Sequence, residues 1–345
     1  MLKKITIIIL TRNRPECIKR QMDYIKNWGA QIFLLDGSDN INLYLQSLPK
    51  RDPNLKYIHD TNGFDVRLMH MKSQIKTKYA MIMSDDEFII KKSLEMCIQF
   101  LENNTDYVSC SGVAVGFMKS FKNKVIYIKK YLRLIGYEIS DEDPKERVIK
   151  HMSEYVPSSV YGVLRSSVIN KFISEINYSF TSSPETTENW LQNTVAYMGK
   201  IKVLPVLYWF RSMENAPIQD KNWNRTIKFY QWYNQKKFKK EKMEYIKKFC
   251  ELNNENSHSF FEHALSNLSK DLHQRGQGTL KLAIKLFFKR GINLFLHKLK
   301  LYKILAKRNE SKFFNYEVLK NFLNENKVIY DSESIKQIEK KILQQ

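Results

Sequence analysis

Strand-like and helix-like segments alternate regularly over the first 85 residues, and this alternation constrains the fold more than any other feature of the chain. Residues 4–10 form a β-branched apolar run, which predicts a strand buried on both faces of a sheet. From Pro15 to about Trp28, apolar residues recur at helical spacing. Further strands are expected at 31–35, 56–59 and 79–83, and helices at 41–48 and 64–75. Strands separated by helices predict an α/β fold with a mostly parallel sheet flanked by helices.

The middle of the chain continues this pattern less regularly. A helix is expected at 91–103, followed by strands at 107–115 and 124–130 that we place near a sheet edge. The charged, turn-rich stretch 139–155 is expected to be a mobile loop over the site. The last expected elements before residue 215 are a strand at 160–164, a helix from Ser166, a helix at 184–198 and a strand at 201–208. Beyond that point the pattern is helical and basic, so we predict two domains, 1–215 and 216–345.

The charge of the chain is large and unevenly distributed. The formal net charge is +21, and residues 218–345 contain 27 Lys and Arg against 13 Asp and Glu, which leaves +14 there. Such an excess attracts nucleic acid, anionic lipid headgroups or a phosphorylated substrate, or it serves solubility alone. No stretch reaches the roughly 18 apolar residues that a membrane-spanning helix needs, and the first residues do not have the pattern of a signal peptide. We therefore expect a cytoplasmic protein, with peripheral attachment at the inner face of the membrane as a further expectation.

Cysteine spacing and standard motifs exclude several classes of protein. The four cysteines lie far apart, which argues against a zinc site or a disulfide framework and favours reduced core residues. The sequence has no Gly-x-Ser-x-Gly, Walker loop, dinucleotide glycine fingerprint or His-Glu-x-x-His pattern. The usual hydrolase, P-loop, dinucleotide-binding and zinc-protease classes are thereby disfavoured.

Polar residues follow three of the predicted strands. They are Thr11, Arg12, Asn13 and Arg14 after the first strand, Asp36, Gly37 and Ser38 after the second, and Ser84, Asp85, Asp86 and Glu87 after the fourth. In parallel sheets, ligands bind beyond the carboxyl ends of the strands, where such loops converge. We therefore expect these three loops to face one crevice.

The carboxylates in this crevice are the main candidates for ligand binding. Asp85, Asp86 and Glu87 would repel one another until a hard cation such as Mg²⁺ or Mn²⁺ binds through one or two of them plus phosphate oxygens. The alternative is an ordinary acidic start of the following helix. Asp36 is placed to accept hydrogen bonds from a base or ribose, and its alternative is a turn-forming aspartate.

A second group of candidates lies outside these loops. Asp65 and Arg67 follow a turn just before the fourth strand, and Arg67 could pair with Asp86 or a phosphate, or be a surface arginine. Glu188 begins a helix and could remove a proton from a substrate hydroxyl, although Glu188 and Glu185 could instead only cap that helix. His151 and Tyr155, on the expected loop, are further candidates for the side of the site that holds this hydroxyl.

Taken together, these motifs resemble the family 2 type glycosyltransferases of GT-A fold over roughly residues 4–212. The opening Ile5-Thr-Ile-Ile-Ile-Leu-Thr-Arg-Asn-Arg-Pro-Glu resembles their first strand and turn, and Leu34-Leu-Asp-Gly-Ser38 resembles their nucleoside-binding loop, with one Asp where many members have two. Ala80-Met-Ile-Met-Ser-Asp-Asp-Glu-Phe88 resembles the metal-binding DXD strand end, with Ser84 at its first position. Glu188-Asn-Trp-Leu191 resembles the general-base region, with Glu in place of the usual Asp.

This resemblance implies a function for the residues already named. Residues 1–215 would be a catalytic domain that binds a UDP-, GDP-, dTDP- or CMP-activated sugar and a Mg²⁺ or Mn²⁺ ion. Asp86 would hold the metal, and Glu188 would be the catalytic base of an inverting transfer. The remaining assignments are a donor-binding set and an acceptor-side set: Thr11, Arg12, Asn13, Arg14, Asp36, Gly37, Ser38, Asp65, Arg67 and Asp85 for the donor, and His151, Tyr155 and Glu185 for the acceptor. The acceptor would be a glycan, a lipid-linked glycan or a protein in cell-surface polysaccharide or glycoconjugate assembly.

The basic C-terminal region leaves several interpretations open. Residues 278–312 carry ten Lys or Arg and one Glu between apolar residues, a basic amphipathic pattern suited to an anionic membrane surface. The alternatives are a helix packed on the catalytic domain, an acceptor-binding element and a dimerising element that would make a homo-oligomer. Two other classes of function stay open: a nucleic-acid-binding protein, against which the acidic crevice argues, and a non-catalytic scaffold.

Overall fold

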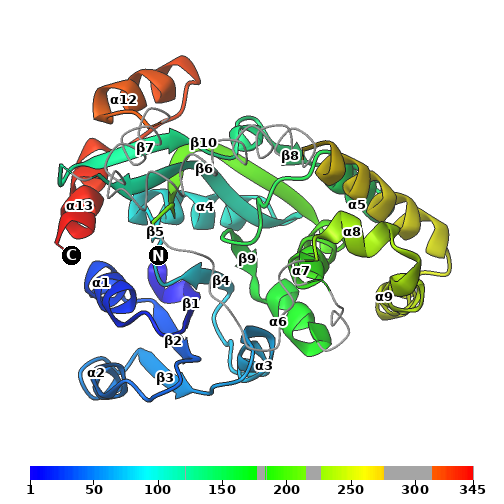
Figure 1. Cartoon of the computed structure of the whole chain (residues 1–345), viewed down its shortest axis with the longest axis horizontal. Coiled ribbons are helices and arrows are strands. Elements are labelled where there is room, and N and C mark those ends of the chain that lie inside the picture. The colour runs from blue at the N-terminus through cyan, green and yellow to red at the C-terminus, as the bar shows by residue number, and fades with distance from the viewer. Residues whose placement is uncertain (121, 177–182, 184, 215–226, 276–312, 345) are drawn as a thin grey trace, which may run out of the picture.

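The computed structural model describes residues 1–120, 122–176, 183, 185–214, 227–275 and 313–344. Its first four strands are parallel, as the sequence predicts, and form one end of the sheet (Figure 1). They are β1 (Ile5–Thr11), β2 (Gln31–Asp36), β3 (Leu55–His59) and β4 (Tyr79–Ser84). β1 and β2 are buried almost throughout, because the sheet is covered on both faces.

The described strands form one ten-stranded mixed sheet. Its main path runs β3-β2-β1-β4-β9-β6-β10-β5, with β7 paired to β6 and β8 paired to β10. The remaining strands are β5 (Phe88–Ile89), β6 (Tyr107–Lys119), β7 (Val125–Lys129), β8 (Glu138–Ile139), β9 (Val163–Arg165) and β10 (Lys200–Ser212). β6 and β10 are parallel to each other, and the short β9 lies antiparallel between β4 and β6.

The expectation that the strand at 107–115 lies near a sheet edge is wrong. β6 is an interior strand, with β10 on one side and β9 and β7 on the other. Its small residues make this position feasible, because a side chain at Gly112 would bring a Cβ atom within 2.6 Å of the Val206 carbonyl oxygen on β10.

Seven helices of the described N-terminal part flank the sheet (Figure 1). They are α1 (Pro15–Ile25), α2 (Leu43–Ser47), α3 (Phe64–Met69), α4 (Lys91–Asn103), α5 (Pro144–Ser153), α6 (Ser166–Glu175) and α7 (Glu185–Met198). All four cysteines of the chain are buried and free, as expected for reduced core residues.

The stretch 139–155 is largely helical and not the expected loop. Asp143 caps α5 by accepting a hydrogen bond from the Lys145 amide at 2.9 Å, and Pro144 occupies the first helical position. Arg147 then donates to the carbonyl oxygens of Ala196 and Tyr197 at the end of α7. The charged residues that look loop-like in the sequence therefore form a capped helix that packs on α7.

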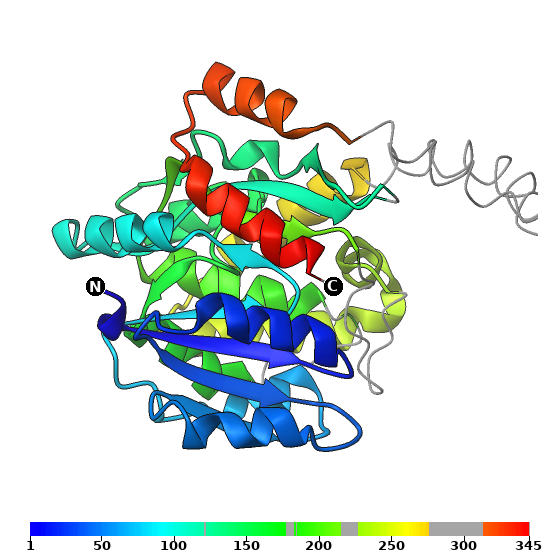
Figure 2. The ribbon, with the colours of Figure 1, turned by 90° about the vertical axis from the view of Figure 1, so that its left-hand side faces the viewer.

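The described C-terminal residues pack on two separate parts of the α/β domain (Figures 1 and 2). α8 (Phe229–Asn234), α9 (Lys239–Leu252) and a helical segment at 258–275 lie beside α7, where the Trp190 ring contacts Tyr245 and Phe249 edge-on. α12 (Tyr316–Glu325) and α13 (Ser332–Leu343) cover the other end of the sheet, where α13 lies next to α1 (Figure 2).

The connection of α12 and α13 to the sheet includes backbone pairing. Phe314 forms an isolated bridge with Tyr127 of β7, and Ile329 forms one with Val206 of β10. The basic amphipathic stretch 278–312 lies outside the described residues, and the division of the chain at 215/216 stays a prediction. Among the residues that the structure describes, no helix is long and apolar enough to cross a membrane.

Candidate active site

The carboxyl ends of β1 and β2 meet in the expected crevice. Thr11 lies opposite Asp36 in the strand register, and the Gly37 amide donates to the Thr11 carbonyl oxygen at 2.9 Å. The buried Asp36 carboxylate accepts from the Ser38 amide at 2.9 Å, from the Ser38 hydroxyl at 2.5 Å and from the Tyr57 hydroxyl at 2.8 Å. Asp36 therefore holds the loop after β2 in shape, and its Oδ2, which accepts only from Tyr57, can still accept a further hydrogen bond.

The loops after β1 and β2 are fastened to each other. Asn13 adopts a left-handed backbone conformation with φ 53°, which asparagine tolerates better than most residues. Asn13 Nδ2 donates to the Asp39 carboxylate at 3.1 Å, and Asn13 Oδ1 accepts from the Asp39 backbone amide at 3.0 Å. Arg12 Nη2 lies 3.5 Å from the same carboxylate. The polar ends of two neighbouring strands thus form one ordered rim.

Arg67 lies beneath this rim and not on the surface, so the surface alternative is wrong. Its guanidinium is buried and donates from Nη1 to the carbonyl oxygens of Thr11 at 2.8 Å and Leu35 at 2.9 Å. A side chain at Gly37 would place Cβ 2.6 Å from Arg67 Cζ, so glycine is needed for this approach. Asp65, also buried, accepts from the Val66 amide at 2.8 Å in the first turn of α3.

The acidic run after β4 faces the same rim. Asp85 accepts from the Thr11 hydroxyl at 2.8 Å, and Asp86 accepts from the Ser84 hydroxyl at 2.9 Å. Arg14 Nη1 bridges the two carboxylates, 3.3 Å from Asp85 and 3.4 Å from Asp86. Desolvation, followed by repulsion from Asp86, raises the pKa of Asp85 to about 7. Asp85 and Asp86 are thus held close together beside the rim.

Glu87 has a different set of partners, which the sequence did not indicate. Its buried carboxylate accepts from Trp209 Nε1 at 2.5 Å and pairs with Arg211. Burial is the main cause that raises the pKa of Glu87 to about 8, although Arg211 opposes it. Both partners come from β10, beyond the predicted strand end at 208. Trp209 and Arg211 are two residues apart on one strand, so their side chains lie on the same face of the sheet. The sequence offers no other signal of this contact, since 122 residues separate Glu87 from Trp209.

Two tyrosines flank the Trp209 ring. Tyr131 stacks on it with ring centroids 5.2 Å apart and planes 12° apart, and Tyr161 lies on it at 4.5 Å. The Tyr161 hydroxyl also accepts from Arg211 at 3.3 Å. Neither tyrosine was among the sequence-predicted site residues, because aromatic residues at this distance from any motif look like ordinary core positions.

Glu188 lies in the first turn of α7, where the Tyr155 hydroxyl donates to its carboxylate. Solvent reaches the Glu188 side chain, whereas Tyr155 is buried. Desolvation by the surrounding protein raises the pKa of Glu188, and the hydrogen bond from Tyr155 opposes that rise. The structure therefore brings together two of the predicted residues, one from α7 and one from the turn after α5.

Glu188 and the acidic run act on the same two aromatic hydroxyls. Burial is the main cause that raises the pKa values of Tyr131 and Tyr161, and the negative charges of Glu87 and Glu188 both add to it. Electrostatic influence of this kind requires proximity. The end of β4 and the start of α7 therefore both lie near these two tyrosines.

His151 and Glu185 have their side chains engaged inside the protein. His151 is fully buried, with Nδ1 bonded to the Tyr137 hydroxyl and Nε2 2.9 Å from Gln192, and burial lowers its pKa to about 4. Glu185 accepts from the Phe229 amide at 2.7 Å and from Lys228 Nζ at 3.0 Å, which ties α8 to α7. Their assignment to the acceptor side stays a prediction.

A divalent cation fits the acidic run by its donor chemistry. No group of three or more His, Cys, Asp or Glu side chains in the described parts of the chain could hold a metal ion on its own. Mg²⁺ sites at phosphate groups, however, commonly use one or two carboxylates, with phosphate and water oxygens as the other ligands. Asp86 and Asp85, which lie side by side at the end of β4, match that smaller set.

Parallel strands that end in polar loops and carboxylates at one edge of an α/β sheet are typical of nucleotide-binding enzyme domains. Within that class, residues 6–165, which span β1 to β9, match the family model described as Glycosyl transferase family 2. Residues 6–165 are thus a family 2 glycosyltransferase domain, as the resemblance in the sequence indicated.

The chain was also compared with curated proteins and with solved structures. No curated protein matches it. Crystal structures of residues 1–349 of S. aureus TarS, alone and in complex with UDP-GlcNAc, are similar, each with 14% sequence identity over 80% of this chain and 92% of TarS 1–349 and a TM-score of 0.42. The complex of TarS 1–349 with UDP has 15% identity, the same coverage and a TM-score of 0.42.

Proposed function

We propose that this chain is a metal-dependent, inverting glycosyltransferase that moves a sugar from a nucleotide-sugar donor to a glycan or lipid-linked acceptor. The reaction would serve the assembly of a cell-surface polysaccharide or glycoconjugate. The observation that carries the proposal is the position of Asp85 and Asp86 beside the rim, where Thr11 donates to Asp85 and Arg14 bridges both carboxylates. Glu188, a carboxylate that solvent can reach, lies at the start of α7.

The rim formed by residues 11–14 and 36–39 is the proposed binding site for the nucleoside. Its parts are held by the hydrogen bonds of Asp36, Asn13 and Arg67 before any ligand binds. Such preorganisation lowers the conformational cost of binding. Asp36 would accept hydrogen bonds from the base or the ribose.

The proposed metal site is Asp86, with Asp85 beside it. A bound Mg²⁺ or Mn²⁺ ion would neutralise negative charge that develops on the leaving diphosphate. Arg14 already supplies one positive charge to both carboxylates. Repulsion between the two carboxylates, which contributes to the raised pKa of Asp85, supports binding of a cation.

Glu188 is the proposed catalytic base. Its carboxylate would take the proton of the acceptor hydroxyl while that oxygen bonds to the anomeric carbon and the bond from this carbon to the diphosphate oxygen breaks. A pKa raised above the usual value makes Glu188 a stronger base near neutral pH. Tyr155 would orient the carboxylate through its hydrogen bond.

The inner face of the cytoplasmic membrane is the proposed place of action. The net charge of +14 in residues 218–345 supports this, because anionic lipid headgroups attract basic segments. A lipid-linked acceptor would be found at the same surface.

Thermal stability tests the donor and metal assignments together. We expect one nucleotide sugar from a panel, added with Mn²⁺, to stabilise the protein by about 2.7 kcal/mol at 100 times its dissociation constant. Asp86→Ala should lose the part of this stabilisation that depends on Mn²⁺. Asp23→Ala, which removes a partly exposed carboxylate on α1, should be stabilised as the parent is. Absence of a shift with every nucleotide sugar would contradict the proposal.

A further inference from the structure

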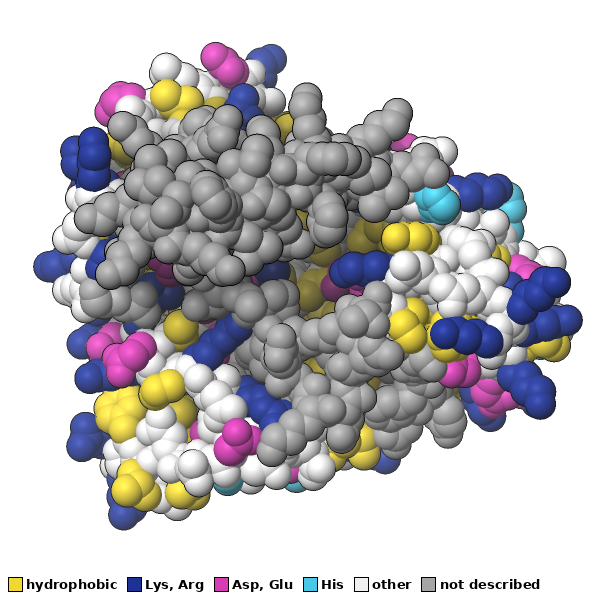
Figure 3. Space-filling model, viewed as in Figure 1, with side chains coloured by type: hydrophobic (Ala, Val, Ile, Leu, Met, Phe, Trp, Pro, Cys, Tyr) yellow, Lys and Arg dark blue, Asp and Glu magenta, His cyan; other side chains and the backbone are white. Residues whose placement is uncertain are grey.

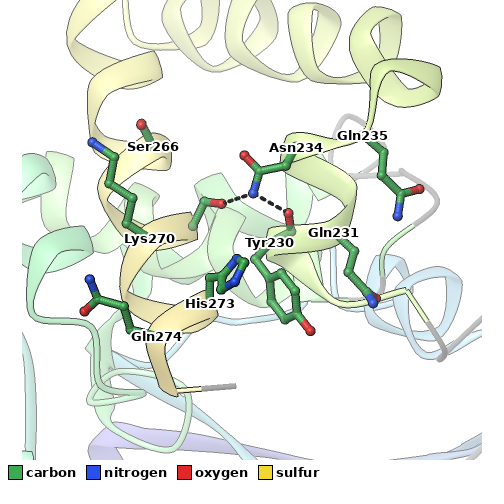
Figure 4. Close-up of a pocket in the computed structure, with 9 residues that line it drawn as sticks. Tyr230, Gln231, Asn234, Gln235, Ser266, Lys270, His273 and Gln274 are labelled. Carbon is green, nitrogen blue, oxygen red and sulfur yellow. Dashed lines mark hydrogen bonds between the residues drawn. The ribbon is translucent and has the colours of Figure 1, made fainter. Parts of the chain in front are cut away.

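A groove of about 590 Å³ lies between α8 and the helical segment 258–275, outside the residues that match the family model (Figure 4). Its walls include Tyr230, Gln231 and Asn234 from α8, and Lys270, His273 and Gln274 from the facing helix. The volume lies within the range of pockets that hold small ligands. None of the residues discussed as donor or metal ligands lines it.

The walls of the groove combine amide groups, an aromatic pair and one cation. The rings of Tyr230 and His273 lie 5.3 Å apart with their planes at 49°. No Asp or Glu is among the described residues that line the groove, and Lys270 is exposed there. Amides can donate to and accept from sugar hydroxyls, aromatic rings offer an apolar surface to sugar C–H groups, and an ammonium group favours a negatively charged ligand.

We propose that this groove binds the body of an acidic glycan whose end is the acceptor, as an extension of the acceptor site. The inference rests on the proposed function, because it requires Glu188 to be the base that takes the proton from the acceptor hydroxyl. It adds to that function a location and a chemical class for the acceptor chain, namely sugars that carry carboxylate or phosphate groups.

Both walls of the groove are tied to the start of α7. On one side, Glu185 accepts from Lys228 Nζ and from the Phe229 amide, at the beginning of α8. On the other, Arg275 at the end of the facing helix donates to the Tyr155 carbonyl oxygen at 2.7 Å, and the Tyr155 hydroxyl donates to Glu188. Tyr230, His273 and Gln274 therefore mark the end of the groove next to the proposed base, and a chain can extend from there towards Asn234.

The groove is already shaped by contacts within the protein. The Asn234 amide donates to the Tyr230 carbonyl oxygen at 2.7 Å and to Ser269 Oγ at 2.9 Å, which fastens the two helices to each other (Figure 4). Beneath α8, the buried Trp232 donates from Nε1 to Glu241 of α9 at 2.9 Å. A groove held in this way can bind an extended ligand without first being ordered.

The charge around the groove has the sign that an acidic ligand needs. Figure 3 shows Lys and Arg side chains gathered over the part of the molecule that contains α8 and α9. Lys236, Lys237, Lys239 and Lys240 are all exposed between and along these helices. They would attract a polyanion over longer distances, whereas Lys270 would contact it in the groove.

Affinity electrophoresis of the full chain tests the inference with three immobilised probes: polygalacturonate, neutral dextran and single-stranded DNA. We expect polygalacturonate to retard the parent protein most. Tyr230→Ala and Lys270→Ala should each weaken this binding about fivefold to tenfold, as expected for loss of a ring contact or a charge-assisted hydrogen bond. Lys240→Ala removes an equal charge outside the groove and should change binding less than twofold.

Two results would overturn the inference. The first is that Tyr230→Ala and Lys270→Ala bind polygalacturonate as tightly as the control variant Lys240→Ala does. Binding would then be due to the general positive charge of the protein and not to the groove. The other is tighter retention by single-stranded DNA than by polygalacturonate, lost in the same two variants, which would make the groove a nucleic-acid site. Unchanged circular dichroism spectra and melting temperatures serve as the check on folding.

The same variants separate failure of this inference from failure of the proposed function. Stabilisation by the nucleotide sugar should be intact in Tyr230→Ala and Lys270→Ala, because neither residue lies at the rim. If the parent shows no such stabilisation, the proposed function fails whatever the groove binds. If stabilisation is present and the groove variants bind polygalacturonate normally, only the groove inference fails.

Discussion

The proposed donor side and the proposed acceptor side of the crevice are built in different ways. On the donor side, the rim at residues 11–14 and 36–39 follows two adjacent parallel strands, and each loop lies directly after its strand. On the proposed acceptor side, Glu188 comes from α7 and Tyr155 from the turn after α5, while Trp209 and Arg211, the partners of Glu87, come from β10. One side is thus a continuation of the sheet, and the other is a meeting of elements distant in the sequence.

The two sides should differ in how well they tolerate substitutions that remove a hydrogen bond or an ion pair. Asp36 has three hydrogen bonds from two residues, so the loss of one leaves the others in place. Glu188 has a single tyrosine partner among the hydrogen bonds described, and Glu87 depends on one cation for its charge. We therefore expect substitutions on the acceptor side to have larger effects than those on the donor side.

The largest expected effect is that of Glu188→Gln. Loss of the proposed base should lower kcat by about 10²–10⁴-fold, because an amide cannot take the proton from the acceptor hydroxyl. Donor-induced thermal stabilisation should be unchanged, since Glu188 lies away from the rim. Steady-state kinetics with the donor found in the thermal panel gives the measurement, and a kcat within threefold of the parent would remove Glu188 from the mechanism.

Arg211→Met should have the next largest effect, on stability. It leaves the buried Glu87 carboxylate without its cation and should lower the free energy of unfolding by roughly 3 kcal/mol. Urea denaturation provides the measurement. Glu87→Gln in the same protein should restore most of the loss, because a neutral amide does not need the cation; equal instability of the double variant would show that Arg211 acts in some other way.

Tyr155→Phe should change the pH dependence of the reaction. The Tyr155 hydroxyl lowers the pKa of Glu188 against the larger effect of desolvation, so its removal should raise that pKa further. Because the base must be ionised, the acidic limb of the pH profile of kcat/KM should move to higher pH. On that limb kcat/KM should be about tenfold lower than in the parent protein. Tyr137→Phe, which removes the hydroxyl bonded to His151, is the control and should leave the limb in place.

The smallest effect is expected on the donor side, from Tyr57→Phe. This variant removes one of three hydrogen bonds to Asp36 and should weaken donor binding by about 1 kcal/mol, or roughly fivefold. Calorimetric titration with the nucleotide sugar gives the dissociation constant. A loss as large as that in Glu188→Gln would mean that the rim is no more tolerant than the acceptor side.

The convergence of the loops on the proposed donor side could be predicted from the sequence almost completely. Thr11, Asp36 and Asp85 each lie at the end of an apolar run, and the rule that parallel strands share a carboxyl edge is sufficient to bring them together. The same rule does not predict the position of β6, where Gly112 allows an interior place in the sheet that the composition of the strand does not indicate. It also does not predict α5, because the capping residue Asp143 lies in a charged stretch that looks like a loop.

What the sequence alone determined is the class of fold, the family of residues 6–165 and the polar residues that meet at the strand ends, because these depend on strand periodicity and on residues next to the strand ends. The tertiary structure decided the surroundings of Glu87 and Glu188 and the groove beside α8. Those contacts join residues as far apart as Glu87 and Trp209, or Tyr155 and Arg275. No local pattern records such pairs, since they form only when the packing of the sheet and helices brings their elements together.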